Sequence, residues 1–153
     1  MKQFLITSME IEIDAPAETV WKVLTDFKNY EAWNPYTVKV DCPELKIGGV
    51  LHIYTPDPSQ PSGFNQMTEY FCAIEPPTRL SWEVMPTAEA PLGAHREHHI
   101  KKLGPNKSTY QTSDAFLGEH AEVLGQQFGG QVKQGFDGIC MGIKKQAEAL
   151  AKK

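Results

Sequence analysis

The sequence has 153 residues, with 15 Lys and Arg against 19 Asp and Glu, which gives a net charge of −4 at pH 7. This length suits a single domain over residues 1–153, and the absence of a concentrated basic block argues against nucleic acid as a partner. No apolar run is long enough to span a bilayer or to form a signal-peptide core, and the three cysteines include no CxxC pair, so we expect a cytoplasmic protein with reduced thiols.

The first part of the chain predicts one strand followed by two short helices. Apolar and polar residues alternate over 3–13, as in a strand with one buried face. Pro16 followed by Glu18 is typical of a first helical turn. A second short helix over 28–32 should end before Pro35, because the residue that precedes a proline is disfavoured in helical geometry.

The middle of the chain predicts an antiparallel meander. Short apolar runs alternate with glycines and prolines, and they fall at 38–40, 50–54, 67–74, 80–84, 95–103 and 109–116. Links of hairpin length join several of these runs, whereas the proline-rich segment 56–63 and the segment 86–93 predict loops. The chain as a whole therefore predicts an α+β domain with a curved seven-stranded antiparallel sheet.

The last stretch, 118–153, predicts one long amphipathic helix. At 100° per residue its apolar side chains form a single stripe: Leu124, Phe128, Val132, Phe136, Ile139, Cys140, Ile143, Ala147 and Leu150. Six glycines between 125 and 142 each cost about 1 kcal/mol of helix propensity relative to alanine. The helix should therefore be stable only against the sheet, and the space between a curved sheet and such a helix is a default ligand site.

Four stretches carry a family resemblance, namely 13–21, 30–35, 75–82 and 116–118, together with Gly135-Phe136 in the last helix. They resemble the SRPBCC superfamily, the START-like helix-grip fold, and most closely its polyketide cyclase/dehydrase and lipid-transport group. The resemblance implies a cavity between the sheet and the long helix that holds lipids, polyketides or other apolar molecules. Some members catalyse cyclisation or dehydration, others carry or sense their ligand, and one branch activates a chaperone ATPase.

The densest polar motif is 95–99, which reads His-Arg-Glu-His-His. The group's pattern implies that Arg96, His98 and Ile100 face the cavity, and His98 replaces an aromatic residue that is usual there. His95, Glu97 and His99 then share the other face. These three offer metal-ligand atoms, but successive same-face residues on one strand spread over about 13 Å, so we expect no metal site from them.

The following strand places Tyr110, Thr112, Asp114 and Phe116 on one face. Asp114 is expected to approach Arg96 or His98 across the antiparallel pair. That contact is either a structural ion pair or a carboxylate that orients an imidazole for proton transfer. Glu69 shares the inward parity of Met67 and Phe71, so its carboxylate needs a partner such as Arg96.

The leading hypothesis is a binding protein without cofactor or metal that holds a small apolar or aromatic molecule, of unknown oligomeric state. The candidate ligand-contacting residues are Trp33, Tyr36, Met67, Glu69, Phe71, Trp82, Arg96, His98, Tyr110, Thr112, Asp114, Phe116, Leu124, Phe128 and Val132. We expect the segment 118–130 to act as the gate of the cavity.

Two alternatives remain open. One is an enzyme of the aromatase, cyclase or dehydratase kind, in which His98 or Asp114 acts as acid/base and Arg96 polarises a carbonyl. The other is a protein-interaction module of the chaperone-ATPase-activator kind, which needs an exposed apolar patch. Met141, on the polar side of the last helix, hints at such a patch.

Overall fold

The computed structural model describes residues 1–153 and contains eight strands, two α-helices and one 3₁₀ helix. In chain order the elements are β1 (Gln3–Thr7), β2 (Ile11–Ile13), α1 (Ala17–Thr25), the 3₁₀ helix η1 (Phe27–Ala32), β3 (Lys39–Asp41), β4 (Val50–Pro56), β5 (Phe64–Glu75), β6 (Arg79–Val84), β7 (Gly93–Gly104), β8 (Lys107–Leu117) and α2 (Ala121–Ala151). This matches the predicted α+β class, with one strand more than expected.

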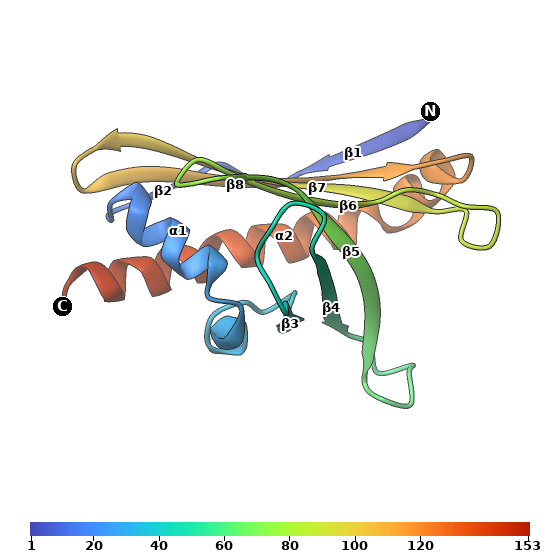
Figure 1. Ribbon diagram of the computed structural model, residues 1–153, viewed down its shortest axis with the longest axis horizontal. Coiled ribbons are helices and arrows are strands. Elements are labelled where there is room, and N and C mark those ends of the chain that lie inside the picture. Colours follow the sequence, from blue (N-terminus) through green and yellow to red (C-terminus); the bar gives the residue numbers. More distant parts are fainter.

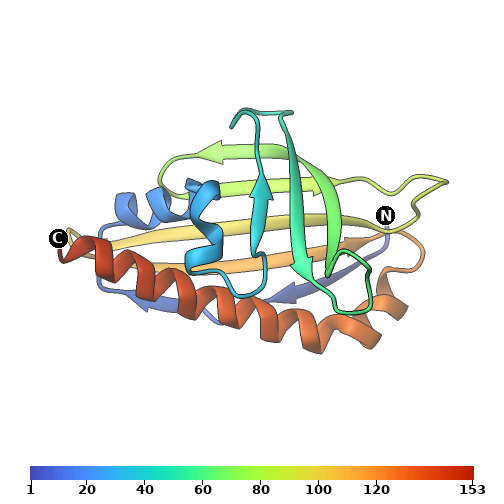
Figure 2. The same ribbon diagram turned by 90° about the horizontal axis from the view of Figure 1, so that it is seen from below.

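All eight strands belong to one antiparallel sheet. The order is β1-β8-β7-β6-β5-β4-β3, and β2 also pairs with β8. The sheet is strongly curved, because β4 and β5 bend toward the helices (Figure 1). Helix α2 runs along the concave side of the sheet, and α1 and η1 lie on the same side (Figure 2). None of the helices combines the length and the apolar character that a membrane crossing requires.

The additional strand arises because the predicted strand over 3–13 is two strands. The chain leaves the ladder at Ser8, whose Oγ accepts a hydrogen bond from the Thr112 amide (3.0 Å). The next amide, that of Met9, donates to Asp137 Oδ1 on α2 (2.8 Å). Helix α2 therefore satisfies this backbone donor outside the sheet, and the prediction of one continuous strand is wrong.

The long helix is buried unevenly along its apolar stripe. Its second half enters the core through Phe136, Ile139, Cys140, Ile143 and Ala147. The first half is less covered, and Phe128 keeps 41% of its surface exposed. Near the helix start, a Cβ on Gly125 would lie 2.2 Å from the Phe4 ring, so this glycine lets α2 lie directly on β1.

Candidate functional site

A cavity lies between the concave face of the sheet and the middle of α2. The cavity has a volume of about 170 Å³. Its walls come from the η1–β3 link, from β4, β5, β7 and β8, and from α2. The lining residues are Tyr36, Thr37, Ile53, Thr55, Met67, Glu69, Leu92, Ala94, Arg96, Asp114, Phe116, Val132 and Phe136.

A second hollow of about 400 Å³ adjoins the cavity and shares Tyr36, Thr55 and Val132 with it. Its other walls are Phe128 and Gln131 of α2 and the Pro56–Pro58 segment at the end of β4. The cavity therefore opens between α2 and the β4–β5 hairpin. The Tyr36 ring lies against the helix where Gly135 leaves room, since a Cβ there would be 2.3 Å from it.

Arg96 on β7 is the buried cation of the site, with 6% of its surface exposed. Its guanidinium is stacked 4.1 Å from the Phe136 ring centroid and 5.8 Å from that of Trp82. Its Nε donates to Thr112 Oγ1 (2.7 Å). Arg96 makes no ion pair with either of the cavity's carboxyl groups, although Asp114 is its direct register partner on β8. The expected ion pair is therefore not formed.

The two carboxyl groups of the cavity also lack partners. Glu69 Oε1 and Asp114 Oδ1 are buried without a hydrogen bond. Burial raises the pKa of Glu69 to about 8, helped by the negative charge of Asp114 and opposed by Arg96. Burial likewise raises the pKa of Asp114 to about 6, against the attraction of Arg96. At pH 7, therefore, Glu69 is mainly a neutral hydrogen-bond donor and Asp114 mainly an anionic acceptor.

His98 lies behind the cavity wall rather than on it. Its ring packs 4.5 Å from that of Trp82, and its Nδ1 is 2.6 Å from the Tyr110 hydroxyl. Burial, followed by the positive charge of Arg96, lowers the pKa of His98 well below its usual value, so the ring is neutral. Its Nε2 is buried without a partner. A proton exchanged with a molecule in the cavity would thus come from Glu69 or pass to Asp114, and His98 would not take part.

The structure brings part of the predicted site together at the cavity. Among the residues predicted from the sequence, those that line it are Tyr36, Met67, Glu69, Arg96, Asp114, Phe116 and Val132. Those packed behind this wall are Phe71, Trp82, His98, Tyr110 and Thr112. Phe128 lines only the outer hollow.

Two predicted residues lie elsewhere. Trp33 packs edge-on against Tyr30, 4.9 Å between ring centroids, within the core formed with α1. Leu124 borders neither the cavity nor the outer hollow. Of the segment 118–130, expected as the gate, only Phe128 reaches the opening, because Gly125 and Gly129 lie over Phe4 and Ile6 of β1.

Sequence reasoning missed several lining residues. The missed side chains are Thr37, Ile53, Thr55, Leu92, Ala94 and Phe136. Ile53 and Phe136 already stood in a predicted strand and on the predicted helix stripe, and the inward parity of these elements was the signal that could have found them. Leu92 and Thr37 lie in loops, where no periodicity of the sequence indicates which way a side chain points.

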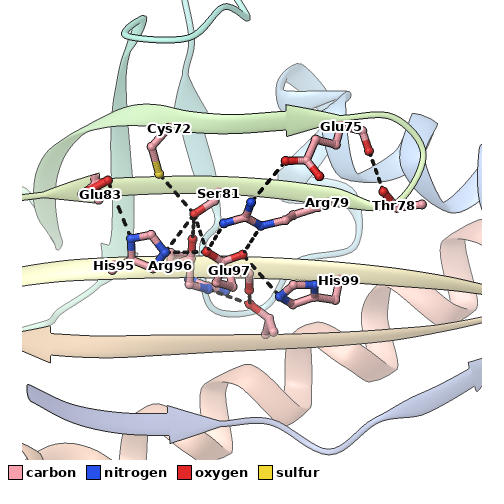
Figure 3. Close-up of polar contacts among 11 residues, drawn as sticks. Cys72, Glu75, Thr78, Arg79, Ser81, Glu83, His95, Arg96, Glu97 and His99 are labelled. Carbon is pink, nitrogen blue, oxygen red and sulfur yellow. Dashed lines mark hydrogen bonds and ion pairs between the residues drawn. The ribbon is translucent and has the colours of Figure 1, made fainter.

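On the opposite, convex face of the same strands the charges are paired (Figure 3). Arg79 donates through Nε and Nη2 to the two oxygens of Glu97 (2.8 and 2.9 Å), and His95 Nε2 also contacts this carboxylate. Burial alone would raise the pKa of Glu97, but hydrogen bonds from Arg79, His95 and Ser81 lower it to about 2.

A family model, described as polyketide cyclase / dehydrase and lipid transport, matches residues 5–137. A comparison with curated proteins finds no match. Among solved structures, the Zhui aromatase/cyclase from Streptomyces sp. R1128 is 18% identical, with a TM-score of 0.75 over 96% of this chain and 94% of that chain.

Norcoclaurine synthase from Thalictrum flavum, in complex with dopamine and hydroxybenzaldehyde, is 14% identical, with a TM-score of 0.69 over 99% of this chain and 89% of that chain. Ara h 8.0201 is also 14% identical, with a TM-score of 0.70 over 97% and 99%. At these identities the likeness is one of fold. It confirms the α+β helix-grip architecture.

Proposed function

Because the chain belongs to the polyketide cyclase/dehydrase and lipid transport family of the SRPBCC superfamily, we propose that it binds a small, mainly apolar or aromatic molecule with a polar group between the sheet and α2. Proteins of this superfamily bind small hydrophobic molecules. One observation carries the proposal for this chain. Three ionisable side chains, Glu69, Arg96 and Asp114, meet at a largely apolar cavity without forming an ion pair with one another.

Burial of a charge without a partner is costly, and buried charges are normally paired and hydrogen-bonded. Here the Glu69 and Asp114 oxygens that lack hydrogen bonds belong to the same cavity as the Arg96 guanidinium. A bound molecule with one hydroxyl or carbonyl group would provide the missing partner, while its apolar part would contact Phe116, Val132 and neighbouring side chains.

The test uses 2-naphthol, which has two fused aromatic rings and one hydroxyl group. We expect saturable 1:1 binding, which is measured through the fluorescence of 2-naphthol. Val132→Trp, which fills the cavity, should weaken binding at least tenfold. Val123→Trp is the matched control, because Val123 lies on the same helix with 66% of its surface exposed. Equal affinity in both variants, or no saturable binding by the wild type, would contradict the proposal.

A second candidate is an enzyme of the cyclase or dehydratase kind. The observation in its favour is that the pKa values of two cavity carboxyls are raised to different extents, to about 6 for Asp114 and about 8 for Glu69. Two titratable groups separated in this way can divide the roles of base and acid. Arg96 would then polarise a substrate carbonyl.

The enzyme candidate is tested with an aromatic β-hydroxy ketone, whose dehydration is followed by the absorbance of the conjugated product. Asp114→Asn should abolish turnover, whereas His98→Phe should retain it, since His98 lies behind the cavity wall. Turnover that depends on His98 and not on Asp114 would reverse these roles. The interaction-module alternative has less support, because it needs an exposed apolar patch and its one hint, Met141, is a single exposed side chain.

A further inference from the structure

A second cluster of ligand-type side chains lies on the convex face of the sheet, across β5, β6 and β7 from the cavity (Figure 3). Cys72, Glu83 and His95 come from these three neighbouring strands. Each offers one ligand atom, and the three atoms lie within 4.8 Å of one another. We propose that this cluster binds a divalent metal ion with affinity for sulfur and nitrogen, Zn²⁺ foremost.

The pairing of the strands brings the three side chains together. Glu83 and His95 are direct register partners on β6 and β7, so their side chains leave the sheet on the same side. Cys72 lies where the register between β5 and β6 shifts, between Phe71 and Ala73. An irregularity of this kind re-aims a side chain, and the Cys72 thiol lies beside Ser81 Oγ, 3.2 Å away.

The spacing of the atoms suits coordination. His95 Nδ1 and Glu83 Oε1 are 3.8 Å apart. A tetrahedral zinc ion with bonds of about 2.0–2.3 Å holds its ligand atoms about 3.3–3.8 Å apart. Side-chain rotations that move an atom by about 1 Å therefore complete a three-ligand site. The side chains of His95 and Glu83 remain 30% and 29% exposed, which leaves access for a water molecule as fourth ligand.

The imidazole is already oriented for this role. His95 Nε2 contacts Glu97 Oε2 and Ser81 Oγ, so Nδ1 is the nitrogen that faces Glu83. Glu97 is held in turn by two hydrogen bonds from Arg79. A histidine that binds a metal usually donates its other ring N–H to a carboxylate, which fixes the tautomer and the ring plane. Glu97 is therefore a positioning residue of the proposed site.

The charges also balance in the bound state. Cys72 binds as the thiolate, and its proton passes to the solvent when the metal enters. One thiolate and one carboxylate then neutralise the two positive charges of the ion. The spacing argument against His95, Glu97 and His99 does not apply here, because the ligands come from three adjacent strands rather than from one.

The experiment is a titration of the full metal-free protein with Co²⁺, a spectroscopic substitute for Zn²⁺. We expect one equivalent to bind with a thiolate-to-cobalt charge-transfer band in the near ultraviolet, and Zn²⁺ to displace it. Cys72→Ser should remove the band, and His95→Ala should weaken binding at least tenfold. Cys42→Ser is the matched control, since Cys42 is the other half-buried free thiol, and it should keep the band.

A positioning role for Glu97 has its own readout. Glu97→Gln should keep the charge-transfer band but lower the cobalt affinity about 10- to 100-fold. The proposal is overturned if the wild type shows no thiolate–cobalt band, if Cys72→Ser retains it, or if Cys42→Ser loses it to the same extent. The wild-type titration tests the proposed metal site even if one of the variants does not fold.

Discussion

The charged side chains on the two faces of the sheet differ in whether they are paired. On the convex face, Arg79 and Glu97 are joined by two hydrogen bonds, and both side chains keep some exposure, 36% and 15%. On the concave face, Arg96 is 6% exposed and has no ion pair, although Glu69 and Asp114 share its cavity. Both sets include a residue of β7, but only the convex charges are paired.

The difference indicates what each set of charges does. Partly exposed pairs such as Arg79–Glu97 cost little to form and contribute modestly to stability. Buried polar groups without partners, here the oxygens of Glu69 and Asp114, cost stability, which supports the proposal that a bound molecule completes the concave set.

The largest expected effect belongs to the buried cation. Arg96→Met keeps a long apolar side chain against Phe136 but removes the donors from the cavity. We expect the affinity for 2-naphthol to fall about 30-fold, equivalent to about 2 kcal/mol, as for the loss of a hydrogen bond to a charged group. Fluorescence titration measures the affinity, and urea denaturation should show that stability falls by less than about 1 kcal/mol. A large loss of stability with unchanged affinity would assign Arg96 a structural role.

A smaller effect concerns the pH dependence of stability. The pKa of Glu69 is about 8 in the folded protein, above its usual 4.5, so the folded state retains a proton that the unfolded state releases. This contribution is full below pH 4.5 and is lost as pH rises through 8. The free energy of unfolding should therefore fall by about 1 kcal/mol between pH 7 and 8.5.

Glu69→Gln should abolish that slope in urea denaturation. The lowered pKa of His98 acts in the opposite sense, but only below about 6.5, outside this window. The raised pKa values of the cysteines also lower stability as pH rises, but mainly above the upper end of this window, near and beyond their usual value of 9. The same slope in wild type and variant would show that Glu69 is ionised in the folded protein.

The smallest effect is expected on the convex face. Arg79→Met removes the partner of Glu97 but leaves the cavity untouched. The free energy of unfolding should fall by about 0.5 kcal/mol, as is usual for a partly exposed ion pair. The affinity for 2-naphthol should not change. A variant that loses affinity here, as Arg96→Met does, would remove the distinction between the two faces.

Which residues of a strand share a face could be predicted from the sequence, because a period of two separates the two faces. The resemblance to the family implied that Arg96, His98 and Ile100 face inward, and all three are buried. The sequence did not predict how far the cavity extends along a strand. His98 has inward parity, but its ring lies between Trp82 and Tyr110, so Arg96 reaches the cavity and His98 does not.

Other features depended on contacts distant in the chain. At the break after Ser8 the chain forms hydrogen bonds with α2, whose residues lie more than a hundred positions later in the sequence. No local sequence pattern therefore predicts the break. The course of α2 over β1 places Gly125 on Phe4 and moves the opening to Phe128 and Val132. The register shift at Cys72 likewise follows from the pairing of two strands.

The most direct test is an NMR titration of ¹⁵N-labelled protein with 2-naphthol. The account predicts saturable shifts for the amides of Glu69, Arg96, Asp114 and Val132, with Arg79 and Glu97 on the convex face unmoved. Shifts centred on the convex face, or shifts that never saturate, would contradict the claim that the cavity and its unpaired charges form the binding site.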